Sequence, residues 1–388
     1  MGERVVLQVL EAHPTLFSSV LERMEEHEVQ ILYTQIDRDA QQRPNFTEHA
    51  YRVDVNAYFY PASTLKLAGA LLALEKLSRV PGIDRDTSLR IGSAREGQEA
   101  VEFDATSPSG RPSIAHYIRK LFVVSDNDAY NRLYEFVGQE HMNRGLWEKG
   151  YCDVRLTHRL SMALSSEENR HTNPFEFYRG DEVLYRQSAE YSAQRLSAGR
   201  RIEKGRGELV DGALLHRPKD FSGANFISVR VLQDLLRAVV FPNSMPPERR
   251  FALSPEDHRF LLQAMSMLPR ECAHPRYDHS TYYDSYVKFF MFGDNKAPMP
   301  RYIRLFNKVG LAYGYLIDNA YIVDFERGIE FMLTAVISAN ENGIYNDSQY
   351  EYDEISFPFL ANLGRVFYER EVQREKKVIP DLSEFKMH

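Results

Sequence analysis

Cysteine and metal-binding patterns are scarce in this sequence. Its 388 residues include only two cysteines, Cys152 and Cys272. Two cysteines are too few for a disulfide framework and do not have metal-site spacing, so we expect both to be free and partly buried, and the redox compartment stays open. The 12 histidines form no H-E-x-x-H or comparable cluster, which argues against a catalytic zinc.

Long hydrophobic runs and an excess of basic charge are also missing. No stretch reaches the roughly 18 uninterrupted apolar residues of a membrane span. The formal net charge is −7, from 48 basic and 55 acidic side chains, which argues against a nucleic-acid partner. Neither of the glycine-rich phosphate-binding motifs occurs, and the first residues show no apolar core of an export signal. These absences leave a globular protein of ordinary composition as the expectation.

The hydrophobic periodicity at the two ends of the chain predicts one sheet with flanking helices. A helix is expected over residues 3–27, with Pro14 as a kink or break, and another over 357–374. We expect strands, with turns at 37–40 and at Asp318, over residues 29–36, 51–58, 305–316, 319–324 and 330–338.

The middle of the chain reads as helical. Helices are expected over residues 64–77, 114–124, 128–137, 229–240 and 255–267. Residues 165–222 are polar and weakly periodic, which indicates a surface insertion. The predicted fold class is therefore α+β: an antiparallel sheet of about five strands flanked by N- and C-terminal helices, plus an all-α domain. The sheet domain would comprise residues 1–58 with 304–388, and the mostly helical domain residues 59–303.

A Ser-x-x-Lys motif, Ser63 to Lys66, begins the most apolar of these helices. Residues three apart share a helix face, so the amine of Lys66 can reach the hydroxyl of Ser63. A buried lysine can lose its proton and accept one from the serine, and the helix N-terminus favours a developing oxyanion. The motif alone is weak, because a capping serine and a surface lysine would also produce it. The same spacing recurs at Ser285/Lys288 and Ser383/Lys386.

Two further motifs follow in the chain. Ser125-Asp126-Asn127 lies between two predicted helices, and Lys308-Val309-Gly310 lies on the first of the closing strands. Each has a structural alternative: Asp126 and Asn127 could cap a helix, Lys308 could be an exposed strand residue, and Gly310 could mark a bulge.

The order of the three motifs resembles that of class A β-lactamases and penicillin-binding proteins, class A most closely. The resemblance implies that a β-lactam or an acyl-D-Ala-D-Ala peptide acylates the serine, so the expected partner is a small-molecule or peptidoglycan-derived substrate. It implies no metal ion, no organic cofactor and a periplasmic or other extracytoplasmic location. The oligomeric state stays open, with a monomer as the default expectation.

The resemblance also implies a role for each matching residue. Ser63 would be the nucleophile, Lys66 its proton partner, and Ser125 the relay of a proton to the leaving nitrogen. Lys308 would supply positive charge opposite Ser125. The expected substrate-binding residues are Asn127, Val309, Gly310 and Leu311, where the backbone N–H of Leu311 would form the oxyanion hole with that of Ser63.

The sequence departs from class A in the residue that would activate the deacylating water. The family's Glu-x-x-Leu-Asn would fall near Ser161 and is missing. Glu167 or Glu168 could replace it if the loop is longer, or both could be solvated loop charges.

Two other departures concern the substrate and the size of the chain. Val309 stands where relatives carry a hydroxyl for the substrate carboxylate, and the usual arginine on the adjoining strand is missing; Arg301 or Arg304 could compensate. The chain between Ser125 and Lys308 is longer than in class A, with additions at about 165–222 and 273–303.

Three functions remain open from the sequence. The first is a serine hydrolase that opens a β-lactam through a Ser63 acyl-enzyme. The second is a D,D-peptidase or esterase-like hydrolase that deacylates β-lactams slowly, which the missing glutamate favours. The third, favoured by Val309, is a catalytically weak penicillin-binding protein.

Overall fold

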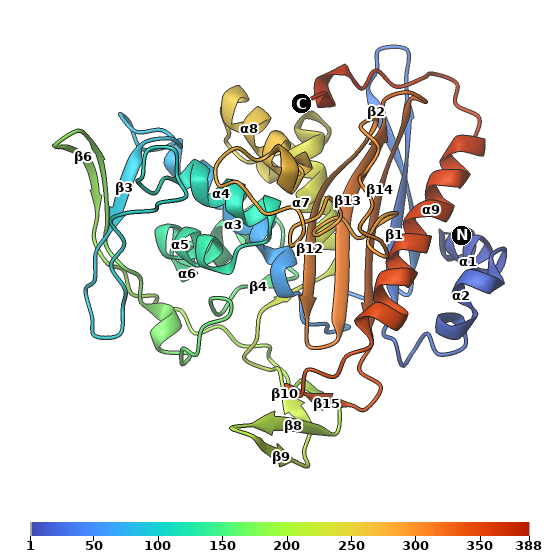
Figure 1. Cartoon of the computed structure of the whole chain (residues 1–388), viewed down its shortest axis with the longest axis horizontal. Coiled ribbons are helices and arrows are strands. Elements are labelled where there is room, and N and C mark those ends of the chain that lie inside the picture. The colour runs from blue at the N-terminus through green and yellow to red at the C-terminus, as the bar shows by residue number, and fades with distance from the viewer. Residues whose placement is uncertain (1, 388) are drawn as a thin grey trace.

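A five-stranded antiparallel sheet forms the centre of the computed structural model, which describes residues 2–387 (Figure 1). Its strands, in spatial order, are β12 (Ile303–Ala312), β13 (Tyr315–Asp324), β14 (Ile329–Ser338), β1 (Gln30–Arg38) and β2 (Pro44–Tyr51). Because β1 pairs with β14, with Thr34 opposite Met332, the two ends of the chain meet in one sheet. The predicted antiparallel sheet of about five strands is confirmed.

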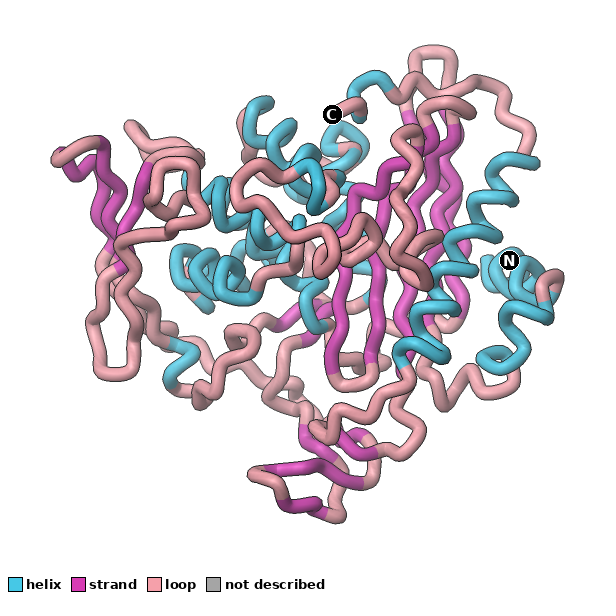
Figure 2. Tube along the Cα trace, viewed as in Figure 1, coloured by secondary structure: helices cyan, strands magenta, loops and turns pink. Residues whose placement is uncertain are grey.

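The two faces of the sheet support two separate hydrophobic cores. Side chains alternate between the faces, so that Leu32 belongs to one core and Ile31 to the other. Helices α1 (Gly2–Glu11), α2 (Pro14–Leu21) and α9 (Phe357–Gln373) cover one face, and α7 (Val229–Val240) packs on the other (Figures 1 and 2). The predicted N-terminal helix is split at Pro14, as its sequence allowed.

Helix α3 (Lys66–Leu77) passes through the middle of the helical region. It contacts α4 (Ile114–Val123), α5 (Asn127–Val137) and α6 (Gln139–Glu148), and every one of its residues except Lys76 is buried. Helix α8 (Pro255–Ser266) packs on α4 and on β12, with Ser254 as its N-cap. Only α6 was not predicted. No helix within residues 2–387 is long and apolar enough to cross a membrane.

The prediction of an all-α domain was wrong, because this region also carries small sheets. A three-stranded sheet consists of β3 (Ser88–Ile91), β5 (Phe175–Arg179) and β6 (Glu182–Gln187), and another consists of β8 (Gly207–Val210), β9 (Ala213–Leu215) and β15 (Ile344–Tyr345). Two short pairs are β4 (Val154–Arg155) with β11 (Phe226–Ile227), and β7 (Glu203–Lys204) with β10 (Lys219–Asp220). Most of these strands lie within 165–222, where short half-exposed strands leave no hydrophobic period. The division into two domains stays a prediction.

The predicted partner of the first strand was wrong. The hairpin turns at Asp39, whose carboxylate accepts hydrogen bonds from the backbone N–H groups of Gln41 and Arg43, and the return strand is β2 rather than residues 51–58. The strand β2 lies at the edge of the sheet and has no buried residue, so its polar residues gave no strand signal.

The predicted turn at Asp318 was also wrong. The strands β12 and β13 turn at Tyr313 and Gly314, which both have positive φ, as a two-residue hairpin turn requires. Asp318 lies inside β13 and is fully buried. Its carboxylate accepts hydrogen bonds from the backbone N–H groups of Phe289 and Phe290, which offset the cost of this burial. The added segment 273–303 thus packs against the sheet.

Candidate active site

Ser63 lies on a tight turn at the start of α3. It belongs to the 3₁₀ helix η1 (Ala62–Leu65), and Ala62 before it has a φ of 47°, in the left-handed region that is costly for a residue with a Cβ atom. The edge strand β12 packs directly on this turn. A Cβ atom at Gly310 would lie 2.7 Å from the carbonyl oxygen of Pro61, so only glycine permits this approach.

Lys66, the first residue of α3, is fully buried. Its Nζ donates hydrogen bonds to the carbonyl oxygen of Ser125, to Oδ1 of Asn127 at 2.6 Å and to Oγ of Ser125 at 3.3 Å. Burial lowers the pKa of Lys66 to about 7, although the charge of Asp126 opposes this shift. A substantial fraction of this amine is therefore neutral near pH 7 and able to accept a proton.

Ser125 occupies the corner between α4 and α5. Its φ of 59° is again left-handed, and its hydroxyl lies between two amines. The Nζ of Lys308 donates to this hydroxyl at 2.8 Å, opposite the 3.3 Å contact from Lys66. Lys308 is almost completely buried, and its pKa lies well below the usual value because of burial and the nearby charge of Lys66. Lys308 is therefore not an exposed strand residue.

Asp126 and Asn127 have different roles. The carboxylate of Asp126 accepts a 2.8 Å hydrogen bond from the backbone N–H of Ala129 and caps α5. This capping role is the alternative that the sequence offered for Asp126. The side chain of Asn127 instead bonds Lys66 through Oδ1 and donates to Oγ of Ser161 at 2.8 Å through Nδ2. Asn127 thus joins the site to the segment around Ser161.

Ser161 and Asn131 were not assigned a role from the sequence. The side chain of Asn131 holds the backbone of Leu160 at both its N–H and its carbonyl group, at 2.8 and 2.9 Å. Leu160, the residue before Ser161, is buried, so this position near the expected glutamate offers no carboxylate. The helical spacing of Asn127 and Asn131, four residues apart, was the available signal.

The three residues after Lys308 are placed differently. The side chain of Val309 is buried in the core on the far side of the sheet, with Leu305 and Leu316. Gly310 faces the turn of Ser63, and Leu311 is 44% exposed. Arg304, the suggested substitute for the missing arginine, is engaged by Glu271 at 2.7 Å.

The two glutamates suggested for deacylation lie on the surface. Glu167 forms ion pairs with Arg170 and His171, and the carboxylate of Glu168 accepts a 2.6 Å hydrogen bond from the backbone N–H of Ser165. These contacts lower the pKa of both groups. Glu168 lines the same cavity of about 360 Å³ as Asn127 and Ser161, whereas Glu167 does not line it.

A buried polar network supports β12 behind Lys308. The Nζ of Lys288 donates to Oδ1 of Asn307 at 2.6 Å, and Nδ2 of Asn307 donates to the carboxylate of Asp318 at 2.8 Å. Ser285 bonds the carbonyl oxygen of Asn295 instead of Lys288. This second Ser-x-x-Lys pair therefore has a supporting place in the fold. Of the three pairs, only Ser63/Lys66 has a lysine that forms a hydrogen bond with Ser125 in the described residues 2–387.

No group of three or more His, Cys, Asp or Glu side chains suited to a metal ion occurs within the described chain, residues 2–387. Cys152 and Cys272 are both free thiols, as expected, but the prediction that both are partly buried was wrong: Cys152 is exposed and Cys272 is buried.

Comparison with known proteins gives a family and a fold. A model described as the beta-lactamase enzyme family matches residues 18–351. No curated protein matches. Among solved structures, the chain is similar to a class A β-lactamase of Clostridium kluyveri, with 13% identity, a TM-score of 0.49 and coverage of 94% of this chain and 98% of that one. The β-lactamase of Streptomyces albus G is 15% identical, with a TM-score of 0.49 and coverage of 93% of this chain and 99% of that one. A class A β-lactamase described as that of the last common ancestor of Gram-negative bacteria is 16% identical, with a TM-score of 0.50 and coverage of 93% of this chain and 98% of that one.

Proposed function

The chain belongs to the beta-lactamase enzyme family, and from this we propose that Ser63 is the residue through which it acts. The protein is a serine hydrolase of the β-lactamase type, which acts on cyclic amide bonds. The observation that carries the proposal is the hydroxyl of Ser125 between the amines of Lys66 and Lys308, beside the turn of Ser63.

In the proposed acylation, neutral Lys66 accepts the hydroxyl proton of Ser63 while Oγ of Ser63 bonds the carbonyl carbon. The backbone N–H groups of Ser63 and Leu311 stabilise the oxyanion. When the intermediate collapses, the C–N bond breaks, and Ser125 gives its proton to the leaving nitrogen. Lys66 then returns a proton to Ser125, which leaves an ester on Ser63.

The cation at Lys308 and the amide of Asn127 are assigned to substrate binding. The buried side chain of Val309 cannot present a donor to a substrate, so recognition by this segment falls to Lys308 and to backbone groups of Gly310 and Leu311. By the resemblance, we place this activity outside the cytoplasmic membrane, and a monomer stays the default expectation for the oligomeric state.

A second candidate function is a D,D-peptidase or esterase-like activity with slow β-lactam deacylation. It is favoured by the surface positions of Glu167 and Glu168, because within residues 2–387 no carboxylate forms a hydrogen bond with Lys66, Ser125 or Lys308. Release of D-alanine from an acyl-D-Ala-D-Ala peptide would measure it.

The direct test is intact-mass analysis after incubation with a penicillin. The wild-type chain should gain one penicillin mass, and Ser63→Ala should gain none. Ser383→Ala is the matched control, since it alters an exposed serine of another Ser-x-x-Lys pair and should acylate normally. An adduct on Ser63→Ala, or neither an adduct nor penicillin hydrolysis with the correctly folded wild type, would refute the assignment. Steady-state assays with a chromogenic cephalosporin then separate turnover from trapping.

A further inference from the structure

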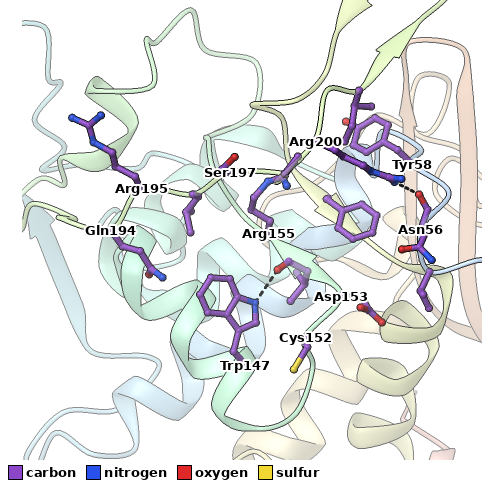
Figure 3. A pocket seen from close by; sticks show the side chains of 16 residues that line it. Asn56, Tyr58, Trp147, Cys152, Asp153, Arg155, Gln194, Arg195, Ser197 and Arg200 are labelled. Atoms are coloured by element: carbon purple, nitrogen blue, oxygen red, sulfur yellow. Dashed lines mark hydrogen bonds between the residues drawn. The ribbon is translucent and has the colours of Figure 1, made fainter.

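A second cavity, of about 550 Å³, lies beside the short strands β4 and β11 (Figure 3). Its walls include Tyr58, Trp147, Arg155, Arg200 and Phe226, and none of the four proposed catalytic residues lines it. It is therefore a feature separate from the site around Ser63, and the proposed function leaves it unexplained.

The cavity contains a buried cation without a counter-ion. Arg155 is 8% exposed, and its Nη2 donates to the carbonyl oxygens of Ser222 and Ala224 at 3.3 and 3.0 Å. Its Nε has no partner, and no carboxylate within residues 2–387 forms an ion pair with it. Burial lowers the pKa of Arg155, although an arginine remains charged. A buried, half-satisfied guanidinium is costly, and an anion would offset that cost.

Other buried arginines in this chain are paired. Arg38 contacts Glu330 at 2.6 Å, and Arg159 contacts Glu135 at 3.2 Å, with both side chains of each pair almost fully buried. Arg304 is held by Glu271 at 2.7 Å, although the side chain of Glu271 is 20% exposed. Arg155 differs from all three, which indicates that its partner is supplied from outside the chain.

The rim of the cavity adds further positive charge. Arg200 reaches across it to the backbone carbonyl of Asn56, and Arg195 stands farther out, with its guanidinium turned away in the view of Figure 3. Neither arginine forms an ion pair with a carboxylate of the described residues 2–387. The only acidic side chain of the lining is Asp153, so cations outnumber carboxylates in these walls.

Three of the remaining wall residues are aromatic, Tyr58, Trp147 and Phe226, and the polar groups of these rings are already satisfied. The hydroxyl of Tyr58 donates to the carbonyl oxygen of Asn225 at 3.2 Å, and Nε1 of Trp147 donates to that of Val154 at 2.9 Å. Tyr58 stacks on Phe226 at a centroid distance of 6.1 Å. Such groups offer apolar ring surfaces to a ligand rather than hydrogen bonds.

We propose that this cavity binds a small organic anion, a carboxylate on a flat apolar body, with the carboxylate on Arg155 and the body against Tyr58, Trp147 and Phe226. Guanidinium groups match carboxylates with paired hydrogen bonds, which gives the charge a defined place in the cavity. The binding does not depend on acylation of Ser63, so it can fail or succeed independently of the proposed function.

Benzoate is a suitable probe, with neutral benzamide as its matched control. Trp147 is the only tryptophan of the chain, so its fluorescence reports on this cavity directly, and calorimetry gives an independent affinity. We expect benzoate to bind with a Kd on the order of 1 mM, and benzamide at least about tenfold more weakly. Ser63→Ala should bind benzoate like the wild type.

Arg155→Gln should lose at least about tenfold in benzoate affinity, since glutamine keeps a donor for the nearby carbonyl groups but removes the charge. Arg179→Gln, an exposed arginine on β5, is the matched control and should change nothing. If Arg155→Gln does not fold, Arg200→Gln at the exposed rim decides, with an expected loss of a few fold. Absence of benzoate binding, equal binding of benzamide, or unchanged affinity in the folded variants would overturn the proposal.

Discussion

Lys308 on β12 donates a 2.8 Å hydrogen bond to the hydroxyl of Ser125, although 183 residues separate the two in the sequence. The contact joins the edge of the sheet to the corner between α4 and α5. Lys66 reaches the same hydroxyl from α3, so three elements meet at one oxygen atom. Positive charges on two amines within hydrogen-bond reach of one hydroxyl repel each other, and burial disfavours both charges further.

The low pKa of Lys66 predicts how acylation depends on pH. Lys66 titrates at about 7, and only its neutral form accepts the proton of Ser63. The acylation rate constant should therefore rise up to about tenfold per pH unit below pH 7 and level off above it. Stopped-flow acylation by a chromogenic cephalosporin measures this, with thermal melting at each pH as the control for unfolding. A profile that still rises steeply above pH 9 would contradict the assignment of Lys66 as the base.

Removal of the Ser125 hydroxyl should slow acylation according to the leaving group. In Ser125→Ala, the carbonyl oxygen of residue 125 can still accept from Lys66, but proton delivery to the leaving nitrogen is lost. We expect a loss of about 10²-fold to 10⁴-fold with a β-lactam and a much smaller loss with an activated ester, because an ester leaving group needs less protonation. Equal losses for both substrates would indicate that Ser125 only positions Lys66.

Gly310 should be intolerant of any side chain. In Gly310→Ala, the new Cβ atom would lie 2.7 Å from the carbonyl oxygen of Pro61 and push β12 away from the turn of Ser63. Overpacking of this kind costs about 1–3 kcal/mol of stability, and acylation should fall at least about tenfold. Gly223→Ala is the matched control, because nothing lies within 4 Å of the position that its new methyl group would take. Equal melting temperatures and acylation rates for the two variants would contradict this account.

The sheet was predictable because its core strands are long and buried, so their hydrophobic runs are unambiguous. The edge strand β2 and the small sheets were not, since half-exposed strands carry no such period. Asp318 was predicted as a turn residue because aspartate is common in turns. The sequence does not show that the carboxylate of this aspartate accepts several hydrogen bonds inside the core.

The candidate site was predictable as far as local spacing reaches. Ser63 and Lys66 share one turn of the chain, whereas the contact of Lys308 with Ser125 depends on how the sheet meets the helices. Motif order suggested that contact only through the resemblance. The bonds of Asn131 to Leu160 and of Asn127 to Ser161 have no motif of their own, so tertiary structure was needed to reveal them.

The lifetime of the acyl-enzyme should not depend on the two surface glutamates. Glu167→Gln and Glu168→Gln should each change the rate of adduct loss by less than about threefold, because a general base contributes about 10²-fold or more. Both carboxylates are held by other partners, and their lowered pKa values make them weak bases. Time-resolved intact mass measures the decay. Prolongation of at least about tenfold in Glu168→Gln alone would identify Glu168 as the deacylation base.

The network behind Lys308 should matter for stability. In Asp318→Asn, the amide has to accept from the backbone N–H groups of Phe289 and Phe290 with its single oxygen, which turns its NH₂ group towards the donor of Asn307. The buried Lys288 also loses the nearby negative charge. We expect a loss of about 2–4 kcal/mol in the free energy of unfolding, measured by urea denaturation. Asp181→Asn, at an exposed turn, is the matched control and should stay within about 0.5 kcal/mol of the wild type. Asp318 acts on Lys308 only through β12 and through its own negative charge. Acylation by the folded Asp318→Asn variant should therefore decline less than acylation by Ser125→Ala. A larger decline with unchanged stability would mean that this carboxylate serves the chemistry rather than the fold.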